Sequence, residues 1–222
     1  MEHQLEYWPV KKTARVVRNG QVTPKTKYFW LVLHGSHMTC EQILFKFRDF
    51  DPETHLVVAP EGLNRFYSQG FSGDVLATWM TSRDRLKEIE DFSDYLTELY
   101  QHYSEQLPEG CKKIILGFSQ GGTTAYRWLH RKKIELDLLL GYACWIPEDI
   151  DLKKSASNFD QLSQVYTYGL QDQYLQEDRV AALKDIIYSN GLDIKFEPYT
   201  GDHRVDRKHL KWLWEKYLLK GL

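Results

Sequence analysis

The chain has 222 residues, of which 42% are hydrophobic and 27% charged, so its composition is that of a globular protein and not of a disordered one. Its formal net charge of -2 excludes a sequence-wide affinity for nucleic acid or for anionic membranes. This length suits one domain and the composition does not change along the chain, so we expect a single α/β domain over residues 1–222.

The three cysteines, Cys40, Cys111 and Cys144, are odd in number and have no CxxC spacing, which predicts neither a disulfide framework nor a metal site. The first residues lack a basic segment followed by an apolar one, so no secretory signal is indicated. No apolar run approaches the roughly 20 residues that cross a bilayer, so we expect no integral membrane segment. We therefore predict a cytoplasmic protein; its oligomeric state is left open, and a homodimer is compatible with the sequence.

The N-terminal part of the chain predicts β structure. Residues 7–33 contain two strand-like runs separated by Asn19 and Gly20, a pair typical of a tight hairpin turn, so we expect an antiparallel N-terminal hairpin. A short helix is expected over 41–50, followed by a buried strand that Pro60 ends.

Residues 60–80 carry several aromatic residues and glycines without steady periodicity, which predicts a long ordered loop. Loops of this length in compact domains are usually functional or disordered, and the aromatic content favours a functional loop.

The rest of the chain alternates helices with strands. A long amphipathic helix is expected from Ser82 onward, and strands and helices then follow in turn, with a polar surface connection at 151–163 and a final helix with one apolar face. This alternation predicts a mostly parallel central sheet with helices on both faces. Sites in such sheets form at the carboxyl ends of the strands.

One motif indicates chemistry. Residues 117–121 read G-F-S-Q-G, between a strand-like run and a helix-like segment, which is the context of a nucleophile turn of the G-x-S-x-G type. The glycines leave room for the backbone to pass closely, so that the hydroxyl of Ser119 projects from the sheet. The alternative is a glycine-rich helix start at which Ser119 only caps the helix.

A serine hydroxyl needs a base, and the base needs an orienting carboxylate. In this strand–turn–helix context the chain order is Ser, then Asp or Glu, then His. This order excludes the histidines that precede the serine or lie in the helix that follows it, which are His34, His37, His55 and His130. Of the two that remain, His203 lies in a loop at the sheet edge, whereas His209 falls beside the apolar stripe of the last helix, so we predict His203 as the base.

Asp172 is the favoured carboxylate because it follows the end of a predicted strand. It could instead be an acidic residue placed near a helix N-terminus by the helix dipole. Asp160 and Asp202 are weaker candidates, because the first precedes the strand and the second adjoins His203 in the sequence.

An acyl-transfer site also needs backbone N–H groups aimed at the developing oxyanion. The N–H of Gln120, directly after the nucleophile, is one expected donor, and its backbone amide is of more interest than its side chain. The second should come from the loop after the early strand, where Gly35 allows close approach and the N–H of Ser36 is the expected donor. His34 is expected to be a structural hydrogen-bonding residue.

Six stretches carry a resemblance to a known family. They are LVLHGS, LATWM, ILGFSQGGTTAY, GYACWIPED, YTYGLQDQYL and GDHRVD, in the family's order and spread over nearly the whole chain. The chain resembles the carboxylesterase and phospholipase group of α/β-hydrolases, which includes the acyl-protein thioesterases. The resemblance implies an α/β-hydrolase fold without a cofactor, and the same roles for Ser119, Asp172, His203, Ser36 and Gln120.

The resemblance also implies that Trp79 and Trp145 stand near an acyl pocket, although core packing explains either tryptophan equally well. The chain departs from the family in the loop HGSHMTC, which lacks the usual second glycine, and in residues 60–78. The expected activity is cleavage of small-molecule or acyl-chain esters or thioesters through a covalent acyl-enzyme. The alternatives are a non-catalytic binding protein on the same fold, or a peptidase or acyltransferase that uses the same triad.

Overall fold

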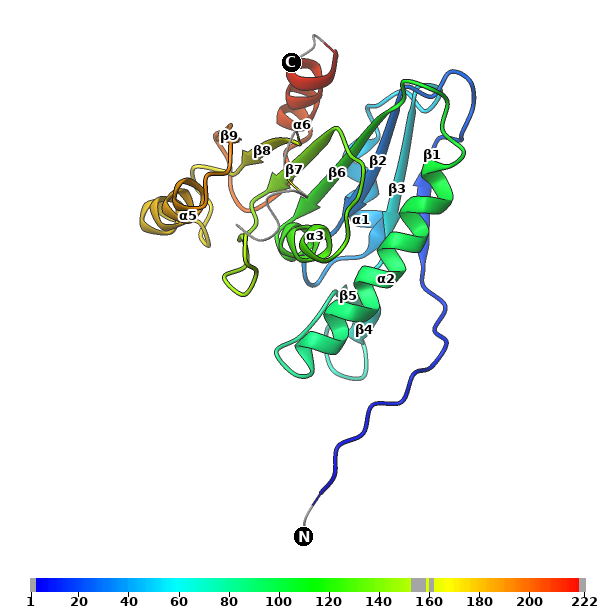
Figure 1. The fold of residues 1–222 in the computed structure, drawn as a ribbon, viewed down its shortest axis with the longest axis vertical. Helices are drawn as coiled ribbons and strands as arrows, with labels where there is room; N and C mark the ends of the chain where they lie inside the picture. The colour runs from blue at the N-terminus through cyan, green and yellow to red at the C-terminus, as the bar shows by residue number, and fades with distance from the viewer. Residues whose placement is uncertain (1–2, 153–158, 160–161, 220–222) are drawn as a thin grey trace.

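The computed structural model describes residues 3–152, 159 and 162–219. Its centre is a seven-stranded sheet with the strand order β1-β3-β2-β6-β7-β8-β9, in which every neighbouring pair is parallel except β1 with β3 (Figure 1). The strands of this sheet are β1 (Val16–Asn19), β2 (Tyr28–Leu33), β3 (His55–Pro60), β6 (Lys112–Phe118), β7 (Leu138–Tyr142), β8 (Ser163–Thr167) and β9 (Ile194–Phe196).

The helices of the described part include a short one after β2, longer ones between the later strands and one after β9. They are α1 (Cys40–Leu44), α2 (Arg85–Ser104), α3 (Gln120–Arg131), α5 (Glu177–Ser189) and α6 (Arg207–Trp214), with a 3₁₀ turn at Phe45–Phe47 and a π-helical segment at Glu215–Leu219. None of the helices in the described ranges is long and apolar enough to cross a membrane. The mostly parallel α/β arrangement predicted from the sequence is confirmed.

Two helical layers cover the sheet because side chains of the buried strands alternate between its faces. Phe29 of β2 packs against Tyr100 of α2, with ring centroids 5.6 Å apart. Its neighbour Trp30 packs in the opposite direction, against Phe47 at 5.2 Å, after α1. Helices α1 and α6 lie on this second side, where Arg207 pairs with Asp49.

The antiparallel N-terminal strand is present, but its partner differs from the expected one. β1 pairs with β3, from Val16 opposite Pro60 to Asn19 opposite Val57, and not with β2 in a hairpin. β3 is buried along its whole length, so it needs a neighbour on each side, and β2 supplies only one of them. Gly20 adopts φ +84° and a Cβ there would lie 2.2 Å from the carbonyl oxygen of His55, so the chain crosses closely over the start of β3.

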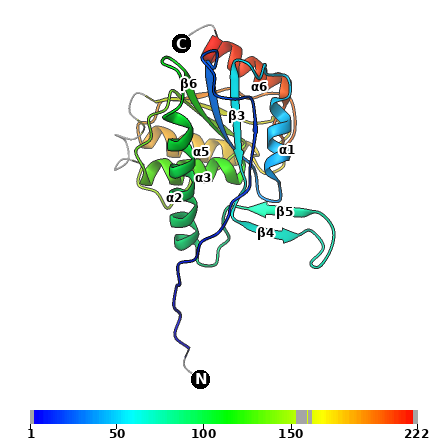
Figure 2. The same ribbon diagram turned by 90° about the vertical axis from the view of Figure 1, so that its right-hand side faces the viewer.

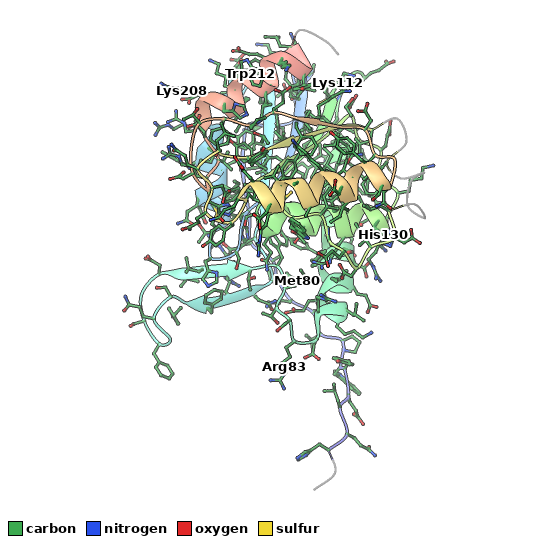
Figure 3. All side chains as sticks on the ribbon, turned by 90° about the vertical axis from the view of Figure 1, so that its left-hand side faces the viewer. Met80, Arg83, Lys112, His130, Lys208 and Trp212 are labelled. Atoms are coloured by element: carbon green, nitrogen blue, oxygen red, sulfur yellow. The ribbon has the colours of Figure 1, made fainter. Side chains whose placement is uncertain are left out.

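Residues 60–80 do not form the predicted loop. They contain a two-stranded antiparallel sheet of β4 (Asn64–Tyr67) and β5 (Val75–Thr78), which projects from the body of the protein (Figures 2 and 3). Phe71 at its turn is fully exposed. β5 returns to the main body beside the loop after β2, where Met38 and Ala77 form an isolated antiparallel bridge. The hairpin thus connects directly to the loop in which Ser36 lies.

Candidate active site

The turn between β6 and α3 carries Ser119 in a strained conformation, with φ +52° and ψ −120°. Positive φ is unfavourable for a residue with a side chain and recurs at functional sites. The N–H of Ser119 donates to the carbonyl oxygen of Tyr142 at 2.9 Å, which ties the turn to the end of β7.

Two glycines explain why the chain can make this turn. A Cβ on Gly117 would lie 2.4 Å from the Cα of Gly122, and one on Gly121 would lie 2.3 Å from the carbonyl oxygen of Leu33. The start of α3 therefore packs directly against the end of β2 and against the strand that precedes it. The local sequence requires small residues here for steric reasons.

The structure brings the three predicted triad residues together. The Nε2 atom of His203 lies 3.0 Å from the Oγ atom of Ser119, and its Nδ1 atom lies 2.6 Å from Oδ2 of Asp172. A carboxylate accepts hydrogen bonds, so Nδ1 carries the proton and Nε2 is left to accept from the serine hydroxyl. This arrangement can remove the hydroxyl proton as the oxygen attacks.

Burial and packing hold the acid and the base in place. The Asp172 side chain is fully buried, and its second oxygen accepts from the N–H of Tyr174 at 2.8 Å. The ring of His203 retains 18% exposure and packs between Tyr174 and Phe118, with centroids 4.8 and 5.0 Å away. Solvent and substrate can therefore reach the histidine but not the carboxylate.

Among the described residues, the other candidates for the carboxylate and the base do not contact Ser119 or His203 in this way. Asp202 forms an ion pair with Arg204 at 2.9 Å, and Asp160 lies outside the described residues. His209 is packed between Tyr199 and Trp212, and its Nε2 atom lies 2.9 Å from the Thr167 hydroxyl. Burial lowers the pKa of His209. It is a packed structural histidine.

The two expected oxyanion donors border the same cavity as Ser119. Gln120 is the first residue of α3, so its N–H has no acceptor within the helix. Ser36 lies in the loop after β2, where a Cβ on Gly35 would lie 3.0 Å from the Phe118 ring. This close approach places the Ser36 loop against the nucleophile turn, which is compatible with the predicted role of both amides.

Contacts of His34 and Trp79 hold the loop that carries Ser36 in place. The Nε2 atom of His34 accepts from the N–H of Gly62 at 2.9 Å, and burial lowers the pKa of this histidine. The indole Nε1 of Trp79 donates to the carbonyl oxygen of His34 at 2.8 Å, and the two rings stack. His34 is a structural residue, as expected.

The position of Trp79 corrects the expectation that it borders the acyl pocket. Its side chain is 1% exposed, and it is not one of the residues that line the cavity beside Ser119. Its ring is occupied by the contact with His34, so it supports the loop and does not meet a substrate.

The cavity lined by Ser119 and His203, which is the candidate catalytic cavity, has a volume of about 650 Å³. Trp145 borders it as expected, and the Trp145 carbonyl oxygen accepts from the Thr123 hydroxyl at 2.8 Å. The cavity is lined by Ser36, His37, Ser119, Gln120, Thr123, Ala143, Cys144, Trp145, Tyr174, Leu175, Arg179 and His203. The lining includes apolar side chains, polar side chains and one arginine, Arg179.

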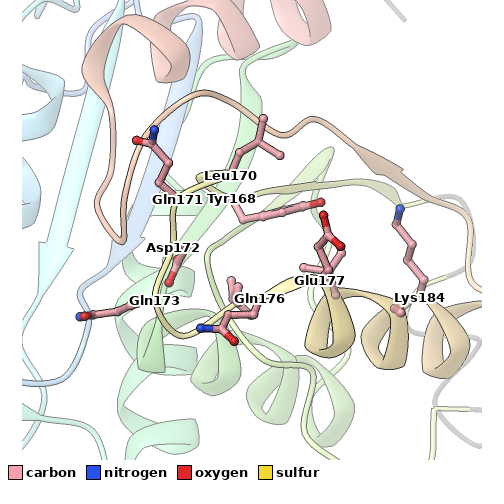
Figure 4. A pocket seen from close by; sticks show the side chains of 11 residues that line it. Tyr168, Leu170, Gln171, Asp172, Gln173, Gln176, Glu177 and Lys184 are labelled. Carbon is pink, nitrogen blue, oxygen red and sulfur yellow. The ribbon is translucent and has the colours of Figure 1, made fainter.

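A second cavity, of about 610 Å³, lies on the other side of the loop that carries Asp172 (Figure 4). Tyr168 and Leu170 line it from the end of β8, and Glu177 and Lys184 extend toward it from α5. Leu175 borders both cavities and separates them.

One cluster in the described residues has the composition of a metal site. Cys40, Glu41 and Glu61 offer ligand atoms within 4.8 Å of one another. Arg15 forms ion pairs with both glutamates, and burial raises the pKa of the Cys40 thiol to about 12. The arginine already supplies the positive charge and the thiol is protonated, so this cluster does not fit a bound cation.

Gln120 and Arg179 have contacts that the sequence did not predict. The Gln120 side chain binds the segment at the end of β5, and Arg179 reaches the catalytic cavity from α5. No motif includes Arg179, and the motif that includes Gln120 predicts a role only for its backbone N–H.

Comparison with known proteins decides the family. A sequence profile of the phospholipase/carboxylesterase family of α/β-hydrolases matches residues 58–217, a range that includes Ser119, Asp172 and His203. The chain belongs to this family. It is therefore a carboxylesterase-type hydrolase with an α/β-hydrolase fold. A search of curated protein sequences finds no match.

Solved structures share the fold of this hydrolase. The acyl-protein thioesterase 2 of Zea mays has 17% identity and a TM-score of 0.66, covering 93% of this chain and 97% of its own. The esterase PE8 has 18% identity and a TM-score of 0.68, covering 95% and 100%. A phospholipase/carboxylesterase from Dyadobacter fermentans has 15% identity and a TM-score of 0.66, covering 95% and 99%.

Proposed function

We propose that this hydrolase cleaves carboxylic esters or thioesters through a triad of Ser119, His203 and Asp172, with a covalent acyl-enzyme intermediate. The observation that carries the proposal is the continuous line of hydrogen bonds from Ser119 Oγ through the imidazole to Asp172, at 3.0 and 2.6 Å. Nucleophilic catalysis needs a hydroxyl, a base within reach and an orienting group.

In the first half-reaction, Ser119 Oγ forms a bond to the substrate carbonyl carbon while Nε2 of His203 takes the hydroxyl proton. The carbonyl oxygen becomes an oxyanion, which the N–H groups of Ser36 and Gln120 stabilise. When the tetrahedral intermediate collapses, the bond to the leaving alkoxide or thiolate breaks and His203 returns the proton to it. The acyl group stays on Ser119.

In the second half-reaction, water replaces the alcohol or thiol. His203 takes a proton from the water as its oxygen attacks the acyl carbon, and the bond to Ser119 Oγ breaks as the proton passes back to the serine. The Asp172 carboxylate orients the ring and stabilises the imidazolium that forms in each half-reaction.

The cytoplasmic location is also a proposal. Cys40, Cys111 and Cys144 are all free and buried, which suits a reducing compartment.

The proposal is tested with a fluorophosphonate probe, which labels an activated serine covalently. We expect stoichiometric labelling of Ser119 in the wild-type chain, none in Ser119→Ala, and hydrolysis of neutral 4-nitrophenyl esters by the wild type only. An unlabelled, inactive wild-type protein would instead support a binding protein that retains the fold.

A further inference from the structure

Arg179 lies in the first turn of α5 and borders the catalytic cavity together with Ser119 and His203. Its guanidinium donates to the carbonyl oxygen of Tyr174 at 3.5 Å, a long hydrogen bond. The N–H of the same Tyr174 donates to Asp172, so the arginine is anchored to the loop that carries the catalytic acid.

Arg179 forms no ion pair with any described residue, and no aspartate or glutamate lines the catalytic cavity. Asp172 is buried behind the His203 ring and is occupied by hydrogen bonds to it and to Tyr174. Asp178, the preceding residue of the helix, lines a smaller depression together with Arg179 but forms no ion pair with it.

One helix N-terminus adds positive potential at this cavity. α3 begins directly after Ser119, and the N-terminus of a helix carries partial positive charge. The first turn of α5 also holds Glu177 and Asp178, whose charges offset the dipole of that helix. The guanidinium of Arg179 and the α3 dipole therefore act together on whatever occupies the cavity.

We propose that the substrate of this hydrolase carries an anionic group, a carboxylate or a phosphate, which Arg179 binds while Ser119 attacks the ester or thioester bond. A guanidinium presents a planar set of donors that pairs with two oxygens of such a group. The anionic group is unchanged in the reaction, so Arg179 is a specificity residue. This inference rests on the proposed function and names the class of substrate for it.

The test compares anionic and neutral esters of matched size. One pair differs in the acyl part, the mono-4-nitrophenyl ester of adipic acid against 4-nitrophenyl hexanoate. The other differs in the leaving group, 3-carboxyphenyl butyrate against phenyl butyrate. The value of kcat/KM is measured for wild type, Arg179→Gln, Arg179→Lys and Arg83→Gln, and uncatalysed rates are subtracted with Ser119→Ala. Arg83 is an exposed arginine between β5 and α2, outside the cavity, and controls for the loss of one charge (Figure 3).

We expect the anionic member of at least one pair to be preferred by the wild type, and Arg179→Gln to lower the ratio of anionic to neutral kcat/KM by roughly tenfold. Arg179→Lys should give an intermediate ratio, and Arg83→Gln the wild-type ratio. The same ratio in Arg179→Gln and wild type for both pairs overturns the inference, even where the neutral esters are cleaved. Failure of the wild type to cleave any ester or to be labelled at Ser119 counts against the proposed function instead.

Discussion

The side-chain oxygen of Gln120 accepts a hydrogen bond from the backbone N–H of Trp79 at 3.0 Å. The same oxygen accepts from the Thr78 hydroxyl at 2.8 Å, and the side-chain nitrogen donates to the carbonyl oxygen of Met80 at 2.8 Å. One side chain thus fastens the nucleophile turn to the end of β5. Because the Trp79 indole also donates to the carbonyl oxygen of His34, this contact links the two segments from which the proposed oxyanion donors come.

We expect Gln120→Ala to lower the free energy of unfolding by about 2 kcal/mol, because it removes three hydrogen bonds and leaves the N–H of Trp79 without its acceptor. It should also lower kcat, by roughly tenfold, because the Gln120 amide loses its support while the triad stays intact. Urea denaturation and ester hydrolysis measure the two effects. Gln101→Ala, on the exposed side of α2, is the matched control. Wild-type stability and rate in Gln120→Ala would contradict this role.

The nucleophile turn could be predicted from the sequence because its requirements are local. A strand, a serine between glycines and a helix are adjacent in the chain, and the residues that follow Ser119 include few histidines to choose from. The hairpin of β4 and β5 could not be predicted in this way. Its turn is held by one backbone hydrogen bond, from the N–H of Ser68 to the carbonyl oxygen of Asp74, and by the Ser68 hydroxyl, which accepts from the N–H of Asp74. The segment has no regular alternation of apolar residues.

Gly121→Ala should destabilise the protein far more than an alanine at a glycine that has space around it. The added Cβ would lie 2.3 Å from the carbonyl oxygen of Leu33, which belongs to the buried strand β2 and cannot move away. Gly110→Ala is the comparison, because Gly110 has φ +76° and no atom within 4 Å of the added Cβ. We expect a loss of about 1 kcal/mol at Gly110, from backbone strain alone, and at least about 3 kcal/mol at Gly121. Thermal unfolding of both variants measures this, and equal losses would show that the clash is relieved.

Asp172→Asn tests whether the carboxylate orients the base. An amide donates through its nitrogen, so it stabilises the His203 tautomer in which Nε2 carries the proton, and that tautomer cannot accept from Ser119. We expect kcat to fall by about 10⁴-fold near neutral pH, with fluorophosphonate labelling slowed in parallel. Asp202→Asn is the control, because Asp202 is exposed and pairs with Arg204. A fall of less than about tenfold would contradict the assignment of Asp172.

The sequence could not show which residues that are far apart in the chain meet around Ser119 and His203. Arg179 is a helical residue with no motif around it, and only the packing of α5 brings it to the cavity of Ser119. The place of Trp79 in a family motif predicts a position beside the pocket, yet Trp79 is buried and its indole donates to the carbonyl oxygen of His34. Such contacts depend on how β5, α3 and α5 pack, which periodicity does not specify.

Buried His55 should make the stability of the protein pH-dependent. Burial lowers its pKa from the usual 6.5 to about 4, and its Nδ1 atom accepts from the Trp30 indole at 3.1 Å. Between these two values the unfolded chain binds a proton that the folded chain does not, so stability falls as the pH is lowered from about 6.5 to about 4. At pH 5 the loss from His55 is about 2 kcal/mol relative to pH 7.

The measurement is the free energy of unfolding in urea at pH 7 and pH 5, for wild type and His55→Gln. The variant should be less stable than the wild type at both pH values, because His55 also stacks on Tyr28. Its loss of free energy of unfolding from pH 7 to pH 5 should be smaller than that of the wild type by about 2 kcal/mol. The lowered pKa values of His34 and His209 act in the same direction in both proteins and cancel in the comparison. Equal pH slopes in the two proteins would contradict the prediction.

Cys144 borders the catalytic cavity but should not react with thiol reagents. Its sulfur is packed so closely that a Cβ on Gly122 would lie 2.5 Å from it, and burial raises the pKa of the thiol to about 12. A protonated, enclosed thiol is a poor nucleophile, in contrast to the Ser119 hydroxyl in the proposed triad. Iodoacetamide at pH 8 should therefore leave ester hydrolysis intact, and all three cysteines should be alkylated only after unfolding in urea. Mass spectrometry of the treated protein identifies the modified residues, and modification of Cys144 in the folded, active enzyme would show that the cavity is more open than its packing indicates.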